Sequence, residues 1–318
     1  MRLSSMIFFN KVIINKPAAL KTKGPLLLAC NHPNSFLDAV LLDILFERPV
    51  WSLARGDVFK KPFYSKLLLK LKMLPVYRTR EGVENLEHNY KTFDACKQIF
   101  KQGGCVLIFS EGLCVNEWHL RSLKKGTARL VTSTWIEQVA GNSKSSALQV
   151  LPVGINYSSF SKIGKNVFIN FGDLISSHEM NLNESDGKMH LQFNQKLQTA
   201  LQPLVFEIEK HDKEKLKKQF ALPPNAILKF LFFIPSLLGY FLNAPLYLFV
   251  KWYVQRRLKE PGHFDSVMLA LLTFLYPIYV VLFAFAFFLF FKSWYCFLIF
   301  ILLPILAKAH IFVKNKTD

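Results

Sequence analysis

A histidine and an aspartate lie six positions apart near the start of the chain, in the stretch CNHPNSFLDAV. An imidazole that a carboxylate holds through one nitrogen can take a proton from a hydroxyl with its other nitrogen. His32 and Asp38 are therefore candidates for a general base and its orienting partner. A structural interpretation also fits, because Ser35 and Asp38 have the spacing of a capping box, with His32 as an ordinary loop residue. The spacing alone favours the structural interpretation.

The segment between these two residues decides whether they can meet. In a continuous helix, a step of six residues rotates the side chain by about 240°, which would point the two apart. Pro33 and Ser35 both favour a helix that starts after His32. We therefore expect residues 33–35 to be non-helical.

Other residues that could take part in chemistry follow predicted strands. Arg78 lies in LPVYRTREG, Glu111 and Gly112 lie in VLIFSEGL, and Pro152 lies in VLPVGINY. Each of these is weak evidence alone. Arg78 could be a solvated surface charge, Glu111 a turn residue and Pro152 a strand terminator. Together with His32 they place a base, a carboxylate and a cation at one edge of a sheet. Such a site suits an anionic substrate that carries a hydroxyl.

Short apolar runs alternate with amphipathic segments over residues 24–172, which predicts an α/β fold with a mostly parallel sheet flanked by helices. The helical pattern over residues 83–102 ends at Gly103 and Gly104, which are typical of a C-cap. Functional groups of such sheets tend to lie where strands end at their carboxyl side, and His32 follows the first predicted strand. The predicted strands cover residues 25–30, 50–54, 74–77, 105–109, 148–153 and 167–171.

The composition points to a membrane surface. The chain has 40 Lys and Arg against 22 Asp and Glu, a formal net charge of +18, 51% hydrophobic residues and 31 Phe. A chain that is both basic and apolar fits a membrane with anionic lipids as its partner. Nucleic acid is not expected as a partner, because a basic protein built for it should not also carry long apolar tracts.

We expect a catalytic domain over residues 1–220 and a helical membrane segment over residues 221–318. The membrane segment contains apolar tracts that each reach the roughly 20 residues needed to cross a bilayer. These tracts cover residues 227–250, 267–291 and 294–313.

The charges around these tracts predict which of them cross. Three crossings would put the basic loop 251–265 and the basic flank 210–229 on opposite sides, against the positive-inside rule. We therefore expect residues 227–250 to form a re-entrant or interfacial hairpin, broken near Pro235 and Pro245. The second and third tracts then cross out and back, which predicts a multi-pass protein on the cytoplasmic face of the inner or plasma membrane.

The cysteines and histidines suggest no metal site. The 5 Cys form no CxxC pair and the His residues lack ligand spacing, so neither zinc nor a disulfide framework is expected. Residues 1–15 lack a sustained signal-peptide core, which agrees with a cytoplasmic catalytic domain. A thiol nucleophile at Cys114 with His119 as its base is a rival mechanism, although a cysteine after a buried strand is more often simply packed.

The order of several short motifs resembles the glycerolipid acyltransferase family, which acylates glycerol 3-phosphate or lysophosphatidate. The motifs are NHPNSFLDA, LPVYRTREG, FSEG with a later LKKGTARL, and LPVGINY, over about residues 24–172. The resemblance implies that His32, paired with Asp38, deprotonates the acceptor hydroxyl, which attacks an acyl thioester. It also implies that Arg78 binds phosphate and that Glu111 and Gly112 bind the acceptor. Acyl-CoA or acyl carrier protein is the implied donor, and no cofactor is expected.

The motifs depart from the family in two places. Five residues separate His32 from Asp38, where the family usually has four, and we interpret the extra residue as a subfamily feature. After Gly112 the chain reads LCV, where the family usually has Thr-Arg-Ser. Arg121, Lys124 and Lys125 are candidates to supply the missing charge to the substrate. The second departure leaves the identity of the acceptor open.

Three hypotheses for the function follow. The leading one is a membrane-bound O-acyltransferase that acts on glycerol 3-phosphate or lysophosphatidate in phospholipid synthesis. An alternative keeps the thioester donor and changes the acceptor, for example to an acyl-amino-acid lipid. A non-catalytic membrane scaffold is the third, and it would have no chemical need for His32 or Asp38.

Overall fold

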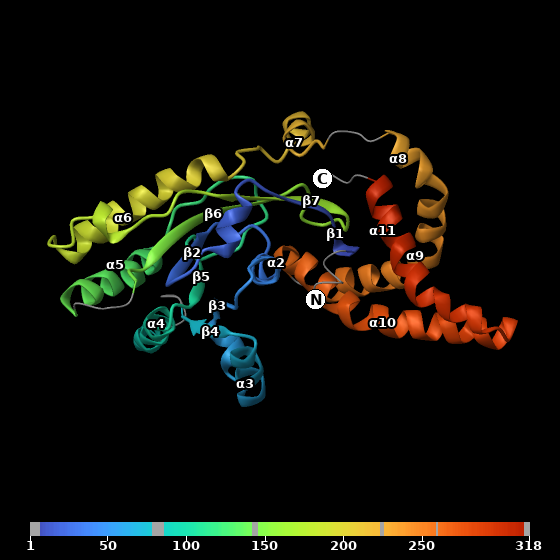
Figure 1. Ribbon diagram of the computed structural model, residues 1–318, viewed down its shortest axis with the longest axis horizontal. Helices are drawn as coiled ribbons and strands as arrows, with labels where there is room; N and C mark the ends of the chain where they lie inside the picture. Colours follow the sequence, from blue (N-terminus) through green and yellow to red (C-terminus); the bar gives the residue numbers. More distant parts are fainter. Residues whose placement is uncertain (1–6, 78–85, 142–145, 223–225, 259, 315–318) are drawn as a thin grey trace.

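A seven-stranded sheet lies at the centre of the part of the chain that the computed structural model describes, which is residues 7–77, 86–141, 146–222, 226–258 and 260–314 (Figure 1). The strand order is β1-β7-β6-β2-β5-β3-β4. The strands are β1 (Phe9–Ile14), β2 (Leu26–Cys30), β3 (Val50–Arg55), β4 (Met73–Val76), β5 (Cys105–Phe109), β6 (Gln149–Tyr157) and β7 (Lys165–Phe171). Among these strands, β6 and β7 pair antiparallel and all other neighbours pair parallel. The predicted mostly parallel α/β fold is confirmed.

Helices cover both faces of the sheet. The helices of this part are α2 (Phe36–Leu45), α3 (Pro62–Lys70), α4 (Leu86–Lys101), α5 (Lys125–Ala140), α6 (Asp186–Leu201) and α7 (Lys213–Gln219). Alternate residues of a strand point to opposite faces, and in β2 Leu26 and Leu28 pack with α2 while Leu27 and Ala29 pack with α4, α5 and α6. Because both faces are covered, every residue of β2 is buried.

The structure agrees with some predicted boundaries and corrects others. The predicted helix over residues 83–102 appears as α4, and residues 83–85 lie outside the described residues. Gly103 has a φ of +71°, as the predicted C-cap requires. Pro152 does not terminate a strand, because it pairs with Ala29 inside β6, which continues to Tyr157. Strand β1 was not predicted.

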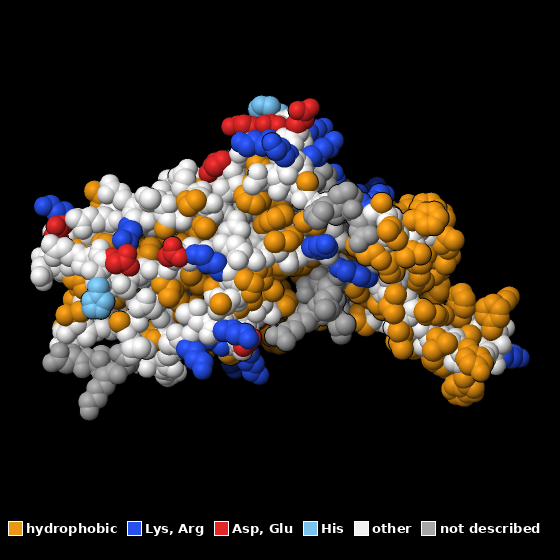
Figure 2. Space-filling model, turned by 45° about the horizontal axis from the view of Figure 1, so that its top comes forward, with side chains coloured by type: hydrophobic (Ala, Val, Ile, Leu, Met, Phe, Trp, Pro, Cys, Tyr) orange, Lys and Arg blue, Asp and Glu red, His pale blue; other side chains and the backbone are white. Residues whose placement is uncertain are grey.

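Apolar helices form the C-terminal part of the structure. They are α8 (Ala226–Leu231), α9 (Phe233–Arg257), α10 (Phe264–Phe291) and α11 (Ile299–Val313). Among the described residues, three helical segments are long and apolar enough to cross a membrane: Phe233–Arg257, Phe264–Phe291 and Trp294–Val313. Figure 2 shows hydrophobic side chains covering most of the visible surface of this part, at the right.

The helix break expected at Pro245 is wrong, because α9 runs unbroken through most of residues 227–250. The re-entrant or interfacial placement of this tract stays a prediction. Pro235 lies in the first turn of α9, where its missing N–H would have no partner within the helix. Pro245 lies inside the helix, which continues to Arg257. Asn243 Nδ2 donates to the Gly239 carbonyl at 2.8 Å in the turn before Pro245.

The C-terminal helices are attached to the sheet domain at separate places. Lys308 of α11 donates to the carbonyls of Phe9 and Asn10 in β1, at 2.8 and 3.0 Å. Met268 and Leu269 of α10 are buried in the same apolar cluster as α2. The two parts of the chain therefore share one core.

Candidate active site

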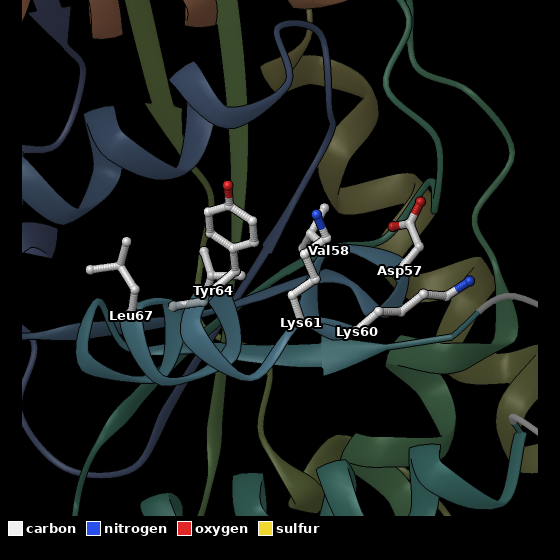
Figure 3. A pocket seen from close by; sticks show the side chains of 7 residues that line it. Asp57, Val58, Lys60, Lys61, Tyr64 and Leu67 are labelled. Atoms are coloured by element: carbon white, nitrogen blue, oxygen red, sulfur yellow. The ribbon is translucent and has the colours of Figure 1, made fainter.

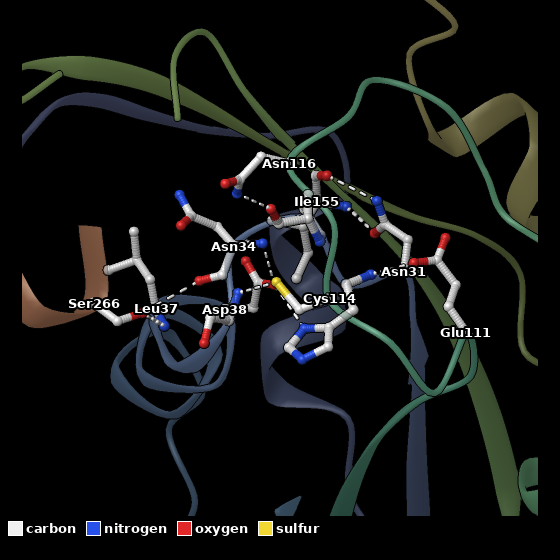
Figure 4. Close-up of polar contacts among 12 residues, drawn as sticks. Asn31, Asn34, Leu37, Asp38, Glu111, Cys114, Asn116, Ile155 and Ser266 are labelled. Atoms are coloured by element: carbon white, nitrogen blue, oxygen red, sulfur yellow. Dashed lines mark hydrogen bonds and ion pairs between the residues drawn. The ribbon is translucent and has the colours of Figure 1, made fainter. Parts of the chain in front are cut away.

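The loop between β2 and α2 carries His32 to the carboxyl edge of the sheet. Figure 4 shows its neighbours Asn31, Asn34 and Asp38. Asn31 holds the start of this loop, because its side chain bonds to both polar backbone groups of Ile155 in β6. Asn31 Nδ2 donates to the Ile155 carbonyl at 3.0 Å, and Asn31 Oδ1 accepts the Ile155 N–H at 2.8 Å. The side chain thus continues the pairing of β2 with β6 for one more step.

His32 and Asp38 meet at the end of this loop. His32 Nδ1 lies 2.9 Å from Asp38 Oδ2. Helix α2 starts at Phe36, so residues 33–35 are non-helical, which is the condition that the spacing imposed. Because a carboxylate accepts at Nδ1, that nitrogen carries the proton and Nε2 is left as the basic nitrogen.

Asp38 is fully buried and its carboxylate is held from several directions. Oδ2 accepts the backbone N–H of Asn34 at 2.8 Å, and Oδ1 accepts the hydroxyl of Tyr157 at 2.8 Å. Burial and the Asp38 charge raise the pKa of Tyr157 well above its ordinary value, so its hydroxyl stays protonated and can donate. These bonds fix the carboxylate that fixes His32.

The His32 ring is also held on its face. It stacks on Phe109, at the end of β5, with ring centroids 3.8 Å apart and planes at 11°. The His32 side chain is 16% exposed. The imidazole is therefore fixed in plane and direction while it keeps access to solvent.

The described residues Ser35 and Asp38 do not form the expected capping box. Ser35 occupies the N-cap position of α2 but makes no side-chain capping bond, and its φ is +52°. Its hydroxyl lies 2.5 Å from His263 Nδ1, and its N–H donates to Cys114 Sγ at 2.9 Å. In a capping box the Asp38 side chain would accept the backbone N–H of Ser35, but here it binds His32 and Asn34 instead. The structural alternative for this stretch is therefore wrong in its capping geometry.

Glu111 ties the His32 loop to the segment that follows β5. Its Oε2 accepts the N–H of His32 at 3.0 Å, and its Oε1 accepts the N–H of Arg121 at 3.0 Å. Only 4% of the residue is exposed. Both oxygens of this carboxylate thus hold backbone, and binding of the acceptor by Glu111 stays a prediction.

The segment where the motif departs from the family braces the same loop. Val115 N–H donates to the His32 carbonyl at 3.2 Å, and Asn116 Nδ2 donates to the Pro33 carbonyl at 2.7 Å. Gly112 has a φ of +64°, and the place of a Cβ lies 3.0 Å from Lys124 Cγ. The LCV sequence therefore belongs to a segment that is hydrogen-bonded to the His32 loop.

The predicted cationic residues lie in different surroundings. Arg121 Nη1 lies 3.3 Å from Glu117 Oε2, and its side chain is 36% exposed. Lys124 is exposed and directly precedes α5. Arg78 lies outside the described residues. The roles of all three in binding substrate stay predictions.

The rival thiol pair finds other partners. Cys114 Sγ accepts the Ser35 N–H, while His119 Nε2 lies 3.2 Å from Glu117 Oε2. Burial raises the pKa of Cys30 well above its ordinary value, which keeps that thiol protonated. Among the described residues no group of three or more His, Cys, Asp or Glu could hold a metal ion.

Sequence reasoning missed several residues that shape the site. Tyr157 is the last residue of the LPVGINY motif and Asn31 directly precedes His32, so the motifs contained both. Phe109 ends a correctly predicted strand. His263 and the residues after it lie more than 200 positions away, and no local signal connects them with His32.

The similarity to known proteins lies in the sheet domain. The acyltransferase family model matches residues 11–156, which include His32, Asp38 and Glu111. The matched residues are therefore similar to the acyltransferase family. The predicted resemblance is confirmed at this level, and the His32 loop lies among the matched residues.

Other comparisons add little about the substrate. One similar solved structure is the 1-acyl-sn-glycerophosphate (LPA) acyltransferase PlsC from Thermotoga maritima, with 14% sequence identity and a TM-score of 0.40. The similarity covers 63% of this chain and 78% of that chain. It is too low to carry an argument about the acceptor. No curated protein matches the chain.

Replacing Tyr157 with Phe tests how far the support of Asp38 matters for acyl transfer. The change removes the donor to a buried carboxylate oxygen, a loss of about 1–3 kcal/mol. We expect kcat to fall by roughly 10- to 100-fold in an acyl-transfer assay. Tyr90→Phe is the matched control, because Tyr90 is 70% exposed. Equal kcat values for the two variants would contradict the support role.

Comparing wild type with Glu111→Gln tests how the pKa of the Glu111 carboxyl affects the stability of the fold. Burial raises the pKa of the Glu111 carboxyl, although the N–H groups of Arg121 and His32 act in the opposite direction. The folded protein therefore binds this proton more tightly than the unfolded chain, and the resulting stabilisation is lost as pH rises through the raised pKa.

The Gln side chain accepts through one oxygen and does not titrate. We therefore expect wild type to have the higher Tm, by an amount that shrinks from pH 5 to pH 8. All other groups titrate in both proteins, so the Tm difference isolates Glu111. A difference that widens as pH rises would contradict a raised pKa.

Proposed function

We propose that the chain is a membrane-bound O-acyltransferase that moves a fatty acyl group from acyl-CoA or acyl carrier protein to a hydroxyl of glycerol 3-phosphate or lysophosphatidate. The observation that supports it best is the buried Asp38 carboxylate, which holds His32 through Nδ1 among the residues that match the acyltransferase family model. Such a pair leaves Nε2 as a fixed general base.

The proposed step proceeds without a covalent enzyme intermediate. His32 Nε2 takes the proton of the acceptor hydroxyl while the hydroxyl oxygen attacks the carbonyl carbon of the thioester. A C–O bond forms, the C–S bond breaks, and the leaving sulfur takes up the proton from His32. Asp38 stabilises the imidazolium during the step, because its carboxylate lies 2.9 Å from Nδ1.

Substitution of His32 with Ala tests this proposal directly. Removing a general base lowers the rate by roughly 10²- to 10⁴-fold. We expect that loss in the acceptor-dependent release of thiol from acyl-CoA and acyl carrier protein by the detergent-purified full chain. Glycerol 3-phosphate, lysophosphatidate and a lyso-amino-acid lipid are offered in turn. His119→Ala is the matched control, and it should keep the wild-type rate.

The outcomes separate the hypotheses. Release that depends on one acceptor and is lost in His32→Ala establishes the base and identifies the acceptor. A loss in His119→Ala alone would support the thiol mechanism. Folded wild-type protein that releases no thiol with any acceptor would support the scaffold.

The apolar helices suggest how the protein sits in the membrane. Near the start of α9, Phe232 contacts Phe312 of α11 with ring centroids 5.8 Å apart, and α11 is bonded to β1 through Lys308. Near its end, Val250 and Val254 are buried in the cluster that contains α2. Both ends of α9 thus lie beside the sheet domain.

We propose that α9 lies at the membrane surface while α10 and α11 cross out and back. This arrangement keeps Lys229 and the pair Arg256 and Arg257 on one side, as the positive-inside rule requires. That side is then the cytoplasmic face, where the sheet domain lies.

Helix α3 offers a second surface for the membrane. None of its nine residues, all of them described, is buried. Phe63 is 74% exposed and Tyr64 50% exposed, and lysines are interleaved with them. A hollow of about 490 Å³ lies beside Lys61, Tyr64 and Leu67, and Figure 3 shows these side chains pointing to one side of α3. Exposed rings among lysines fit a bilayer with anionic head groups.

A triple change of Lys60, Lys61 and Lys66 to Gln tests this surface. Each lysine near an anionic surface contributes about 1 kcal/mol of attraction. We expect wild type to work faster in nanodiscs with anionic phospholipid than in neutral ones, and the triple variant to lose most of that ratio. Lys91, Lys101 and Lys188, changed together to Gln, remove the same charge elsewhere and should keep the ratio. An unchanged ratio in the α3 variant would contradict the proposed contact.

A further inference from the structure

The first turn of α10 reaches into the loop that carries the base. Asp265 Oδ2 accepts from Asn34 Nδ2 at 2.7 Å, and Ser266 Oγ accepts the N–H of Leu37 at 3.0 Å. Figure 4 shows Ser266 on the ribbon of α10 beside Leu37 and Asn34. These contacts fall on residues that lie between His32 and Asp38 or next to Asp38. The apolar helix therefore holds the segment that sets the geometry of the pair.

Asn34 connects the two ends of this arrangement. Its side chain is held by Asp265, and its backbone N–H donates to Asp38 Oδ2 at 2.8 Å. Asp38 Oδ2 is also the oxygen that binds His32 Nδ1. A shift of Asn34 would therefore move a donor away from the oxygen that orients the base.

Asp265 is itself fixed by a buried charge. Its side chain is 1% exposed, that of Lys165 is 0% exposed, and the two form an ion pair. Lys165 Nζ also lies 5.9 Å from the ring centroid of Tyr157, which donates to Asp38. A buried carboxylate with a paired charge and a hydrogen bond has little freedom to move.

A plain anchor explains these contacts less well. Apolar packing of Met268 and Leu269 against the α2 cluster would already attach α10 to the sheet domain. Burying a charged pair and several hydrogen bonds at this contact gains little stability over apolar side chains of similar volume. What the polar groups add is a defined position for Asn34 and Leu37.

We propose that the first turn of α10, through Asp265 and Ser266, is a positioning element for the His32–Asp38 pair, so that the proposed membrane helix completes the active site. The inference rests on the proposed function, because it assigns these residues a role in the step that His32 catalyses. Asp265 and Ser266 act through Asn34 and Leu37 and do not touch the reacting atoms.

Two double variants separate the effect of the hydrogen bond to Asn34 from the effect of the buried ion pair. Lys165→Met with Asp265→Asn removes both charges and keeps an oxygen that can accept from Asn34 Nδ2. Lys165→Met with Asp265→Leu removes the same charges and offers a side chain of similar size with no acceptor. The two variants carry the same charge and differ in whether the side chain at position 265 can accept from Asn34 Nδ2.

We expect the Asn variant to keep kcat within about threefold of wild type. The Leu variant should lose roughly 10- to 100-fold in kcat with little change in KM, because a displaced base slows the chemical step more than binding. The assay is thiol release by the full chain, with Tm measured in the same detergent. Equal kcat values for the two variants at equal Tm would overturn the proposal.

Ser266 gives an independent measurement that leaves no buried charge unpaired. Ser266→Ala removes the acceptor for the Leu37 N–H, and Ser266→Thr keeps it. We expect a lower kcat for Ala and recovery for Thr. This pair decides the question if the double variants fail to fold, and equal rates for Ala and Thr would overturn the proposal. Val281→Ala, on the half-exposed side of α10, is the control for changes in the helix itself.

The result is distinguishable from a failure of the proposed function. If wild type shows no acceptor-dependent release, the proposed function fails whatever α10 does. If wild type is active and His32→Ala is not, while the Leu and Asn variants are equally active, only the role of α10 fails.

Discussion

The buried Asp38 carboxylate is the group on which the site depends. A charge with no exposure to water must be satisfied by donors, or the fold loses several kcal/mol. The donors come from separate parts of the chain: His32 and Asn34 from the β2–α2 loop, and Tyr157 from the end of β6. Satisfying this one carboxylate therefore fixes the loop, the helix and the strand relative to one another, and the base is oriented as a consequence.

The parts of this arrangement that the sequence could predict are those with local signals. Buried strands such as β2 and β5 are short apolar runs bounded by polar residues, so their places and the carboxyl edge of the sheet could be predicted. The meeting of His32 and Asp38 required only that residues 33–35 be non-helical, and Pro33 indicated that. Strand β1 gave a weaker signal, because its first residues, FNKV, mix polar and apolar types, and among the described strands it is an edge strand paired with β7.

The wrong expectations fail for a common reason: a long-range partner outweighs a local preference. Ser35 has the sequence of a capping residue, yet its hydroxyl binds His263 and its backbone takes a φ of +52°. Pro245 suggests a break, yet α9 continues through it, packed so closely on α11 that a Cβ on Gly239 would lie 2.0 Å from the Leu306 carbonyl oxygen. Neither His263 nor Leu306 could be connected with its partner without the fold.

An enzyme that acylates a lipid must pass a hydrophobic product to the bilayer. Each CH₂ exposed to water on the way costs about 0.8 kcal/mol, so the reacting groups should lie at the depth where the membrane begins. If the protein has the proposed function, the first turn of α10 meets this requirement. Its residues hold Asn34 and Leu37 and also begin the proposed membrane helix. A tether of flexible chain would fix only the distance from the membrane. A helix whose own side chains position the catalytic loop fixes depth and orientation together, which explains why buried polar groups occur at a contact that apolar residues could have made.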